Sequence, residues 1–110
     1  MMLIRRLLPA LILFLSGTSV CFAGENISGK EVFDKHCIYC HAAGEEYTGT
    51  RQLAATRGKD KAVLEERNDL PADYIKYIVR HGLKAMPPFL PTAVTDAELK
   101  ALTDYLTRNP

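Results

Sequence analysis

The sequence predicts an all-α protein with one small domain. No segment alternates apolar and polar residues for long enough to indicate a strand. Two segments open with the Ser/Thr-x-x-Glu pattern of a capping box, and apolar residues in the second half of the chain recur at helical spacing. With 110 residues, the chain is long enough to bury one core. We therefore expect helices joined by loops.

Residues 1–23 have the composition of a secretory signal peptide. Two arginines precede an apolar run, and Cys21-Phe22-Ala23 supplies the small residues expected before a cleavage point. We therefore expect a mature domain over residues 24–110, exported to the periplasm. An uncleaved membrane anchor is the alternative, but the apolar run over residues 3–15 is shorter than the ~20 residues that span a bilayer. A lipid on Cys21 is disfavoured because the branched Val20, not a small residue, precedes it.

The expected mature chain is nearly neutral. Without Arg5 and Arg6, 12 basic and 13 acidic residues remain and give a net charge of −1. Nucleic-acid binding requires a basic face, so the composition argues against that class of function. A protein partner could still recognise a local charge patch.

The first helix is expected to begin after Ser28, because Glu31 completes a capping box and Ile27 and Val32 occupy the staple positions. It should run into the segment 37–40. Beyond that segment, glycines and polar residues predict a loop, with a short helix around residues 62–67.

A second long helix is predicted over residues 71–81. Proline is tolerated in a first helical turn, apolar residues share one face, and Gly82 supplies a stop. The following segment, 83–94, holds three prolines, which predicts a stiff loop. Thr95 and Glu98 then form a second capping box, and the last helix should bury a stripe made of Leu99, Leu102 and Leu106.

The strongest chemical signal is Cys37-Ile38-Tyr39-Cys40-His41. Two thiols three positions apart can add to the two vinyl groups of one haem, and the adjacent His41 then lies under the iron as its proximal ligand. The alternatives are a zinc site and a redox dithiol. Zinc needs four ligands, and the histidines have no finger-like spacing, whereas a redox dithiol is expected in a βαβ context. The motif therefore predicts one covalent haem c held by Cys37 and Cys40.

Met86 is the predicted second axial ligand of the haem iron. It is the only methionine after residue 23, and it lies in Lys84-Ala85-Met86-Pro87-Pro88, where the prolines can hold a thioether against iron at low entropic cost. His36 and His81 are the rival ligands. His36 adjoins Cys37 on the proximal side, and His81 is expected to interact with the last carbonyls of its helix.

Further residues are candidates to surround the haem. The apolar candidates for its walls are Leu53, Tyr74, Ile78 and Leu90. The cationic candidates for pairing with its propionates are Arg67, Lys76, Arg80 and Lys84, although most such charges in proteins are simply solvated.

Together these features resemble the class I c-type cytochromes. Gly29 and Phe33 precede Cys37 at the spacing that family uses, and Leu102 and Tyr105 match its last helix. The resemblance implies a cytochrome c-like fold, three to four helices wrapped around one haem, with the first and last helices in contact. The family often has a proline after the haem histidine, whereas this chain has residues 44–49 without one. The sequence therefore leaves the partner of His41 open, and a backbone carbonyl of that loop could still serve.

A closer resemblance is to small cytochromes and cytochrome subunits of periplasmic dehydrogenases, such as that of p-cresol methylhydroxylase. It covers residues 70–75, 79–82, 85–89 and 95–99, whereas the segment 50–69 is longer than that subunit implies. The resemblance implies an electron carrier, not an enzyme. Its donor would be a flavin- or quinone-dependent dehydrogenase, and its acceptor another cytochrome or a terminal oxidase. The alternative function is a haem enzyme or sensor that binds peroxide or a gas at an open sixth site.

Overall fold

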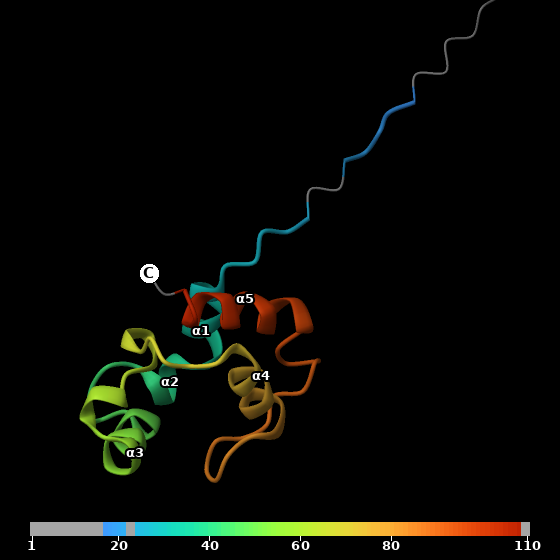
Figure 1. Cartoon of the computed structure of the whole chain (residues 1–110). Coiled ribbons are helices and arrows are strands. Elements are labelled where there is room, and N and C mark those ends of the chain that lie inside the picture. Colours follow the sequence, from blue (N-terminus) through green and yellow to red (C-terminus); the bar gives the residue numbers. More distant parts are fainter. Residues whose placement is uncertain (1–16, 22–23, 109–110) are drawn as a thin grey trace, which may run out of the picture.

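The structure is a computed structural model, and it describes residues 17–21 and 24–108. The predicted signal peptide therefore lies mostly outside the described residues. Within the described ranges the chain forms helices and no strand, which confirms the all-α prediction (Figure 1). No helix there is long and apolar enough to cross a membrane.

The first and last helices are far apart in the sequence and pack against each other. Helix α1 covers Gly29–His36, and α5 covers Asp96–Leu106. Ser28 Oγ accepts a hydrogen bond from the Glu31 amide at 3.4 Å, so the predicted start of α1 is confirmed. The second predicted capping box is complete, because Thr95 and Glu98 bond each other's backbone amides.

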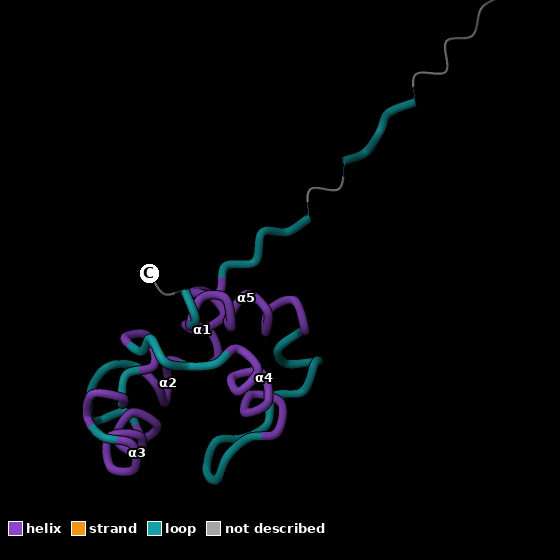
Figure 2. The backbone as a smooth tube through the Cα atoms, viewed as in Figure 1, coloured by secondary structure: helices purple, strands orange, loops and turns teal. Residues whose placement is uncertain are grey.

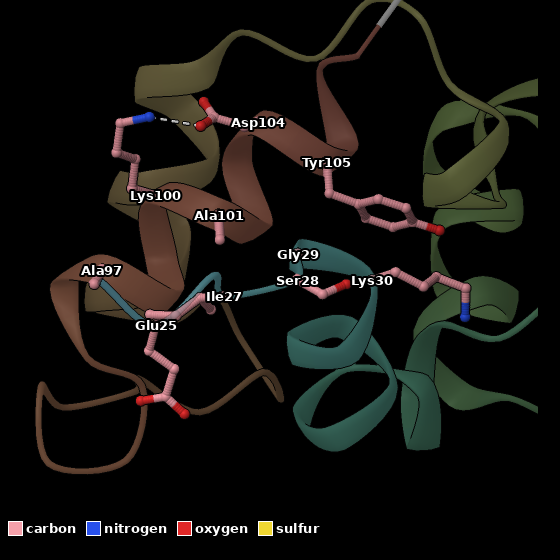
Figure 3. Close-up of a pocket in the computed structure, with 10 residues that line it drawn as sticks. All are labelled: Glu25, Ile27, Ser28, Gly29, Lys30, Ala97, Lys100, Ala101, Asp104 and Tyr105. Atoms are coloured by element: carbon pink, nitrogen blue, oxygen red, sulfur yellow. Dashed lines mark hydrogen bonds and ion pairs between the residues drawn. The ribbon is translucent and has the colours of Figure 1, made fainter. Parts of the chain in front are cut away.

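The contact between α1 and α5 depends on Gly29 having no side chain. A Cβ at this position would overlap the Ala101 carbonyl oxygen and the Tyr105 Cβ. Figure 3 shows Gly29 facing Ala101 where the two helices meet. The close approach buries Phe33 completely and leaves Leu102 only 2 % exposed. The helix contact that the family resemblance implied is therefore confirmed.

Below the α1–α5 pair in Figure 1, α2 and α3 lie together at the left and α4 lies at the right. Helix α2 covers Ile38–His41, α3 covers Thr48–Arg57, and α4 covers Ala72–His81. Pro71 caps α4 from just outside it, and Gly82 ends it with φ of 72°. The predicted second helix is therefore confirmed with a start one residue later.

The prediction of a loop after His41 is wrong over α3. This helix buries only Thr50, whose hydroxyl donates to the Ala42 carbonyl oxygen at 2.7 Å. Its stability therefore comes from packing on α2, which an apolar periodicity does not reveal. The short helix expected around residues 62–67 is a 3-10 helix over Leu64–Glu66, and a second 3-10 helix, Lys59–Lys61, precedes it. The loop between α4 and α5 carries no regular structure, as predicted (Figure 2).

The buried core joins α1, α4 and α5. It consists mainly of apolar side chains from these helices, with Val94 from the loop before α5: Val32, Phe33, Ile75, Val79, Val94, Leu99, Leu102 and Leu106. The predicted stripe on the last helix is confirmed. A separate surface groove of about 520 Å³ runs along the α1–α5 contact, lined by residues such as Glu25 and Lys100 and by none of the predicted haem residues (Figure 3).

Candidate functional site

The Cys37–His41 motif forms a single helical turn at the junction of α1 and α2. The Cys40 and His41 amides both donate to the Cys37 carbonyl oxygen, at 3.2 Å and 2.9 Å. Cys37 is half-buried and packs against the core, whereas Cys40 is exposed. One thiol therefore faces inward and the other outward along the same turn.

The environment of Cys37 favours a neutral sulfur. Burial, with a smaller contribution from the Cys40 charge, raises the pKa of the Cys37 thiol to about 11. In the absence of a metal, this thiol therefore stays protonated at neutral pH. Within residues 17–21 and 24–108, no three His, Cys, Asp or Glu side chains lie close enough to share a metal ion.

The imidazole of His41 is oriented by α3. A Cβ built on Gly49 would lie 2.8 Å from His41 Cε1, 2.9 Å from His41 Nδ1 and 2.7 Å from the Cys40 carbonyl oxygen. The Nδ1 edge of the ring is therefore packed against the backbone of α3, which leaves Nε2 as the nitrogen available to a metal. Burial lowers the pKa of His41, which favours the neutral ring, the form in which histidine binds iron.

No backbone carbonyl supports His41 in the way the sequence suggested. Nδ1 is buried and has no hydrogen-bond partner among the described residues. The nearby Ala42 carbonyl oxygen instead accepts from Thr50. The ring is therefore positioned by close packing against Gly49.

Met86 lies in a tight turn directly after α4. The Leu83 amide donates to the Met86 carbonyl oxygen at 3.0 Å, and the Met86 amide donates to the Leu83 carbonyl oxygen at 2.9 Å. Lys84 adopts φ of 52° to close this turn. The Met86 side chain is half-buried and packs against the same core as Cys37. The structure therefore brings these two predicted site residues, 49 positions apart in the sequence, to one core.

A contact that the sequence did not predict joins the two halves of the site. The rings of His36 and Phe89 meet edge to face with centroids 6.2 Å apart. His36 Nε2 is buried and has no partner within the described part of the chain. His36 itself is half-buried, at the end of α1. Only the three-dimensional proximity of α1 to the Met86 loop reveals its partner.

His81 behaves as predicted for a residue at a helix end. Its Nδ1 lies 2.8 Å from the Tyr77 carbonyl oxygen, and its ring stacks on Tyr77 with centroids 4.1 Å apart. His81 is exposed. These contacts direct the imidazole to its own helix.

Two of the predicted propionate partners, Arg67 and Arg80, already form hydrogen bonds within the protein. Arg80 bonds two carbonyl oxygens and Asp96, and Arg67 forms two hydrogen bonds to Asp69. Neither guanidinium is therefore simply solvated. Among the predicted wall residues, Leu53 and Ile78 are half-buried, and the others are exposed: Tyr74 to 43 % and Leu90 to 62 %.

Comparison with known proteins agrees with this arrangement. Residues 24–106 match the family "Cytochrome C oxidase, cbb3-type, subunit III". The chain is 36 % identical over 83 residues to the cytochrome c subunit of 4-cresol dehydrogenase [hydroxylating] from Pseudomonas putida. The aligned residues make up 76 % of this chain and 61 % of that protein. It is 31 % identical over 97 residues to cytochrome c6 from Thermostichus vulcanus, covering 88 % of this chain and 81 % of the relative.

A solved structure shows the same fold. The crystal structure of p-cresol methylhydroxylase with substrate bound contains a chain that is 38 % identical to this one, with a TM-score of 0.54. The alignment covers 76 % of this chain and 93 % of that chain. Sequence and fold together lead to one conclusion: the chain belongs to the cytochrome c family, as a monohaem class I cytochrome that carries covalent haem c and transfers electrons.

Proposed function

We propose that Cys37 and Cys40 hold the haem through thioether bonds and that His41 and Met86 are its axial ligands. The observation that carries this proposal is the orientation of His41, whose Nδ1 edge is packed against Gly49 so that Nε2 is the ring nitrogen left for the iron. The burial of Cys37 against the core supports an apolar haem edge at that position. The turn over residues 83–86 supports a fixed Met86.

The chain's own residues would set the conditions for one-electron transfer. When bound, the haem supplies the change between ferrous and ferric iron. The neutral sulfur of Met86 and the apolar core beside it disfavour extra positive charge at the iron, so both would raise the reduction potential. Because the turn and the core hold Met86 in place, the ligand set can stay the same in both oxidation states.

We further propose that the protein works in the periplasm, after removal of residues 1–23. The family match begins at residue 24, directly after the expected cleavage point. The likeness to the cytochrome subunit of a dehydrogenase supports a flavin- or quinone-dependent dehydrogenase as the electron donor. The acceptor would be another cytochrome or a terminal oxidase.

Replacing Met86 tests the ligand assignment. Met86→Ala should lower the reduction potential by on the order of 0.1 V and let carbon monoxide bind the ferrous protein rapidly, because it removes the sulfur from the iron. His81→Ala is the control, since His81 bonds its own helix, and it should leave the potential unchanged. A potential unchanged in the Met86 variant, or rapid carbon monoxide binding by the wild type, would contradict axial ligation and favour an open sixth site.

The partner is tested by reduction kinetics. Ferric protein is mixed with purified periplasmic flavin- or quinone-dependent dehydrogenases and their substrates, and haem reduction is followed by stopped-flow absorbance. Electron-transfer encounters of this kind use small interfaces, so the rate should be fast and depend on salt if charges steer the docking. Failure of every such dehydrogenase to reduce the protein would argue against this class of donor.

A further inference from the structure

The loop that carries Met86 makes few backbone hydrogen bonds to the helices on either side of it. Prolines at 87, 88 and 91 have no amide hydrogen to donate. Beyond the 83–86 turn, the Ala93 and Val94 amides donate to the Leu90 carbonyl oxygen at 2.8 Å and 3.0 Å. One backbone bond ties the loop to α4, from the Phe89 amide to the Val79 carbonyl oxygen at 2.8 Å. Such a segment needs other groups to fix its path between α4 and α5.

Arg80 supplies those groups from the last turn of α4. One terminal nitrogen of its guanidinium donates to the Phe89 carbonyl oxygen at 2.9 Å and to the Val94 carbonyl oxygen at 2.8 Å. The other terminal nitrogen donates to Asp96 Oδ1, at the start of α5, at 2.6 Å. A single side chain therefore holds both sides of the loop and the first residue of the next helix.

The hydrogen bonds from Arg80 to the two carbonyl oxygens lie in a largely buried part of the protein. The Arg80 side chain is only 19 % exposed, whereas Asp96 is 89 % exposed. Val94, whose carbonyl oxygen accepts from Arg80, is buried, and Phe89 contacts the ring of His36. The planar, fork-shaped guanidinium suits three acceptors in fixed positions, which an ammonium cannot match. Most of the effect should therefore come from the two carbonyl bonds.

We propose that Arg80 is a positioning residue that holds the Met86 loop closed, so that the methionine sulfur stays at the iron. This inference rests on the proposed ligation by Met86. Without the guanidinium, the carbonyl oxygens of Phe89 and Val94 lose a charged donor, and the loop can move away while the α1–α5 core stays intact. Arg80 thereby acts on the iron through the loop. It holds the loop at Phe89, three residues after Met86, and does not touch the ligand itself.

Cyanide binding to the ferric holoprotein measures this opening. An external ligand binds only the fraction of molecules whose sixth site is open, so its apparent affinity reports the opening equilibrium. Losing hydrogen bonds from a charged donor should increase cyanide affinity in Arg80→Leu by about 10- to 100-fold. The near-infrared absorption that marks methionine bound to ferric haem should weaken in parallel. Arg80→Lys should restore part of the wild-type behaviour, because an ammonium can satisfy some of the acceptors.

Two further variants separate the possible outcomes. Leu106→Ala leaves a cavity at the far end of α5, lowers the global stability, and should leave cyanide affinity near that of the wild type. Equal cyanide affinities in Arg80→Leu and the wild type, or an equal increase in Leu106→Ala, would overturn the positioning role. Met86→Ala should set the upper limit of cyanide affinity. If it bound cyanide no better than the wild type, the ligand assignment itself would fail.

Discussion

Replacing Gly49 by alanine tests whether α3 positions the haem histidine. The added methyl group would lie 2.7 to 2.9 Å from three atoms, two of them in the His41 ring and one a backbone oxygen. Ordinary contacts begin at 3.4 Å, so each of these atoms must yield by roughly half an ångström or more. Such overpacking costs about 1–3 kcal/mol. The higher helix propensity of alanine offsets up to ~1 kcal/mol of that cost.

The middle of the overpacking range, about 2 kcal/mol, less this offset leaves an expected net loss of about 1–2 kcal/mol, or a fall in Tm of roughly 5–15 °C for a domain of this size. Thermal unfolding of the holoprotein measures the stability, and the paramagnetically shifted NMR signals of the His41 ring report its displacement. Thr48→Ala, at the exposed first residue of the same helix, is the control and should leave both unchanged within about 0.5 kcal/mol. A Gly49 variant as stable as the wild type, with unshifted His41 signals, would refute the packing argument.

Two further predictions concern the contact between the first and last helices and the cap of α5. Gly29→Ala should lower the free energy of unfolding by about 2–3 kcal/mol, because the methyl group meets backbone across the α1–α5 contact; denaturant unfolding with unchanged stability would contradict this. Thr95→Ala should cost about 1 kcal/mol by removing half of the capping box. The hydrogen bond from the Thr95 amide lowers the pKa of Glu98, so the Glu98 carboxylate stabilises the fold above its ordinary pKa of 4.5 and loses that effect as the pH falls. Glu98→Gln should therefore flatten the acid side of the plot of unfolding free energy against pH. A slope equal to that of the wild type would count against the cap.

The elements that could be predicted from sequence are those with local signals. Both capping boxes mark their helices within a few residues, and Gly82 ends α4 through a conformation that glycine tolerates. Helix α3 carries no such signal. It has a single buried residue, Thr50, and it forms because that hydroxyl and Gly49 fit against α2. A pattern along one segment does not contain that information.

The same distinction applies to the site. The cysteine spacing and the lone methionine after residue 23 identify the candidate ligands, because haem chemistry constrains residue types that are close in sequence. Arg80 was a candidate for the haem propionates, yet its acceptors are 9, 14 and 16 residues further along the chain. Which acceptors an arginine finds depends on how the loop returns over α4. The sequence alone does not determine that path.

The α1–α5 contact also determines when the fold can form. During synthesis the residues of α1 emerge first and those of α5 last, so Val32 and Phe33 have no partner until almost the whole chain is available. Closing so long a loop is entropically costly and places the contact among the slower steps of folding. A chain truncated before α5 would therefore remain without a core, and an unfolded cysteine segment would stay accessible for as long as the last helix is missing.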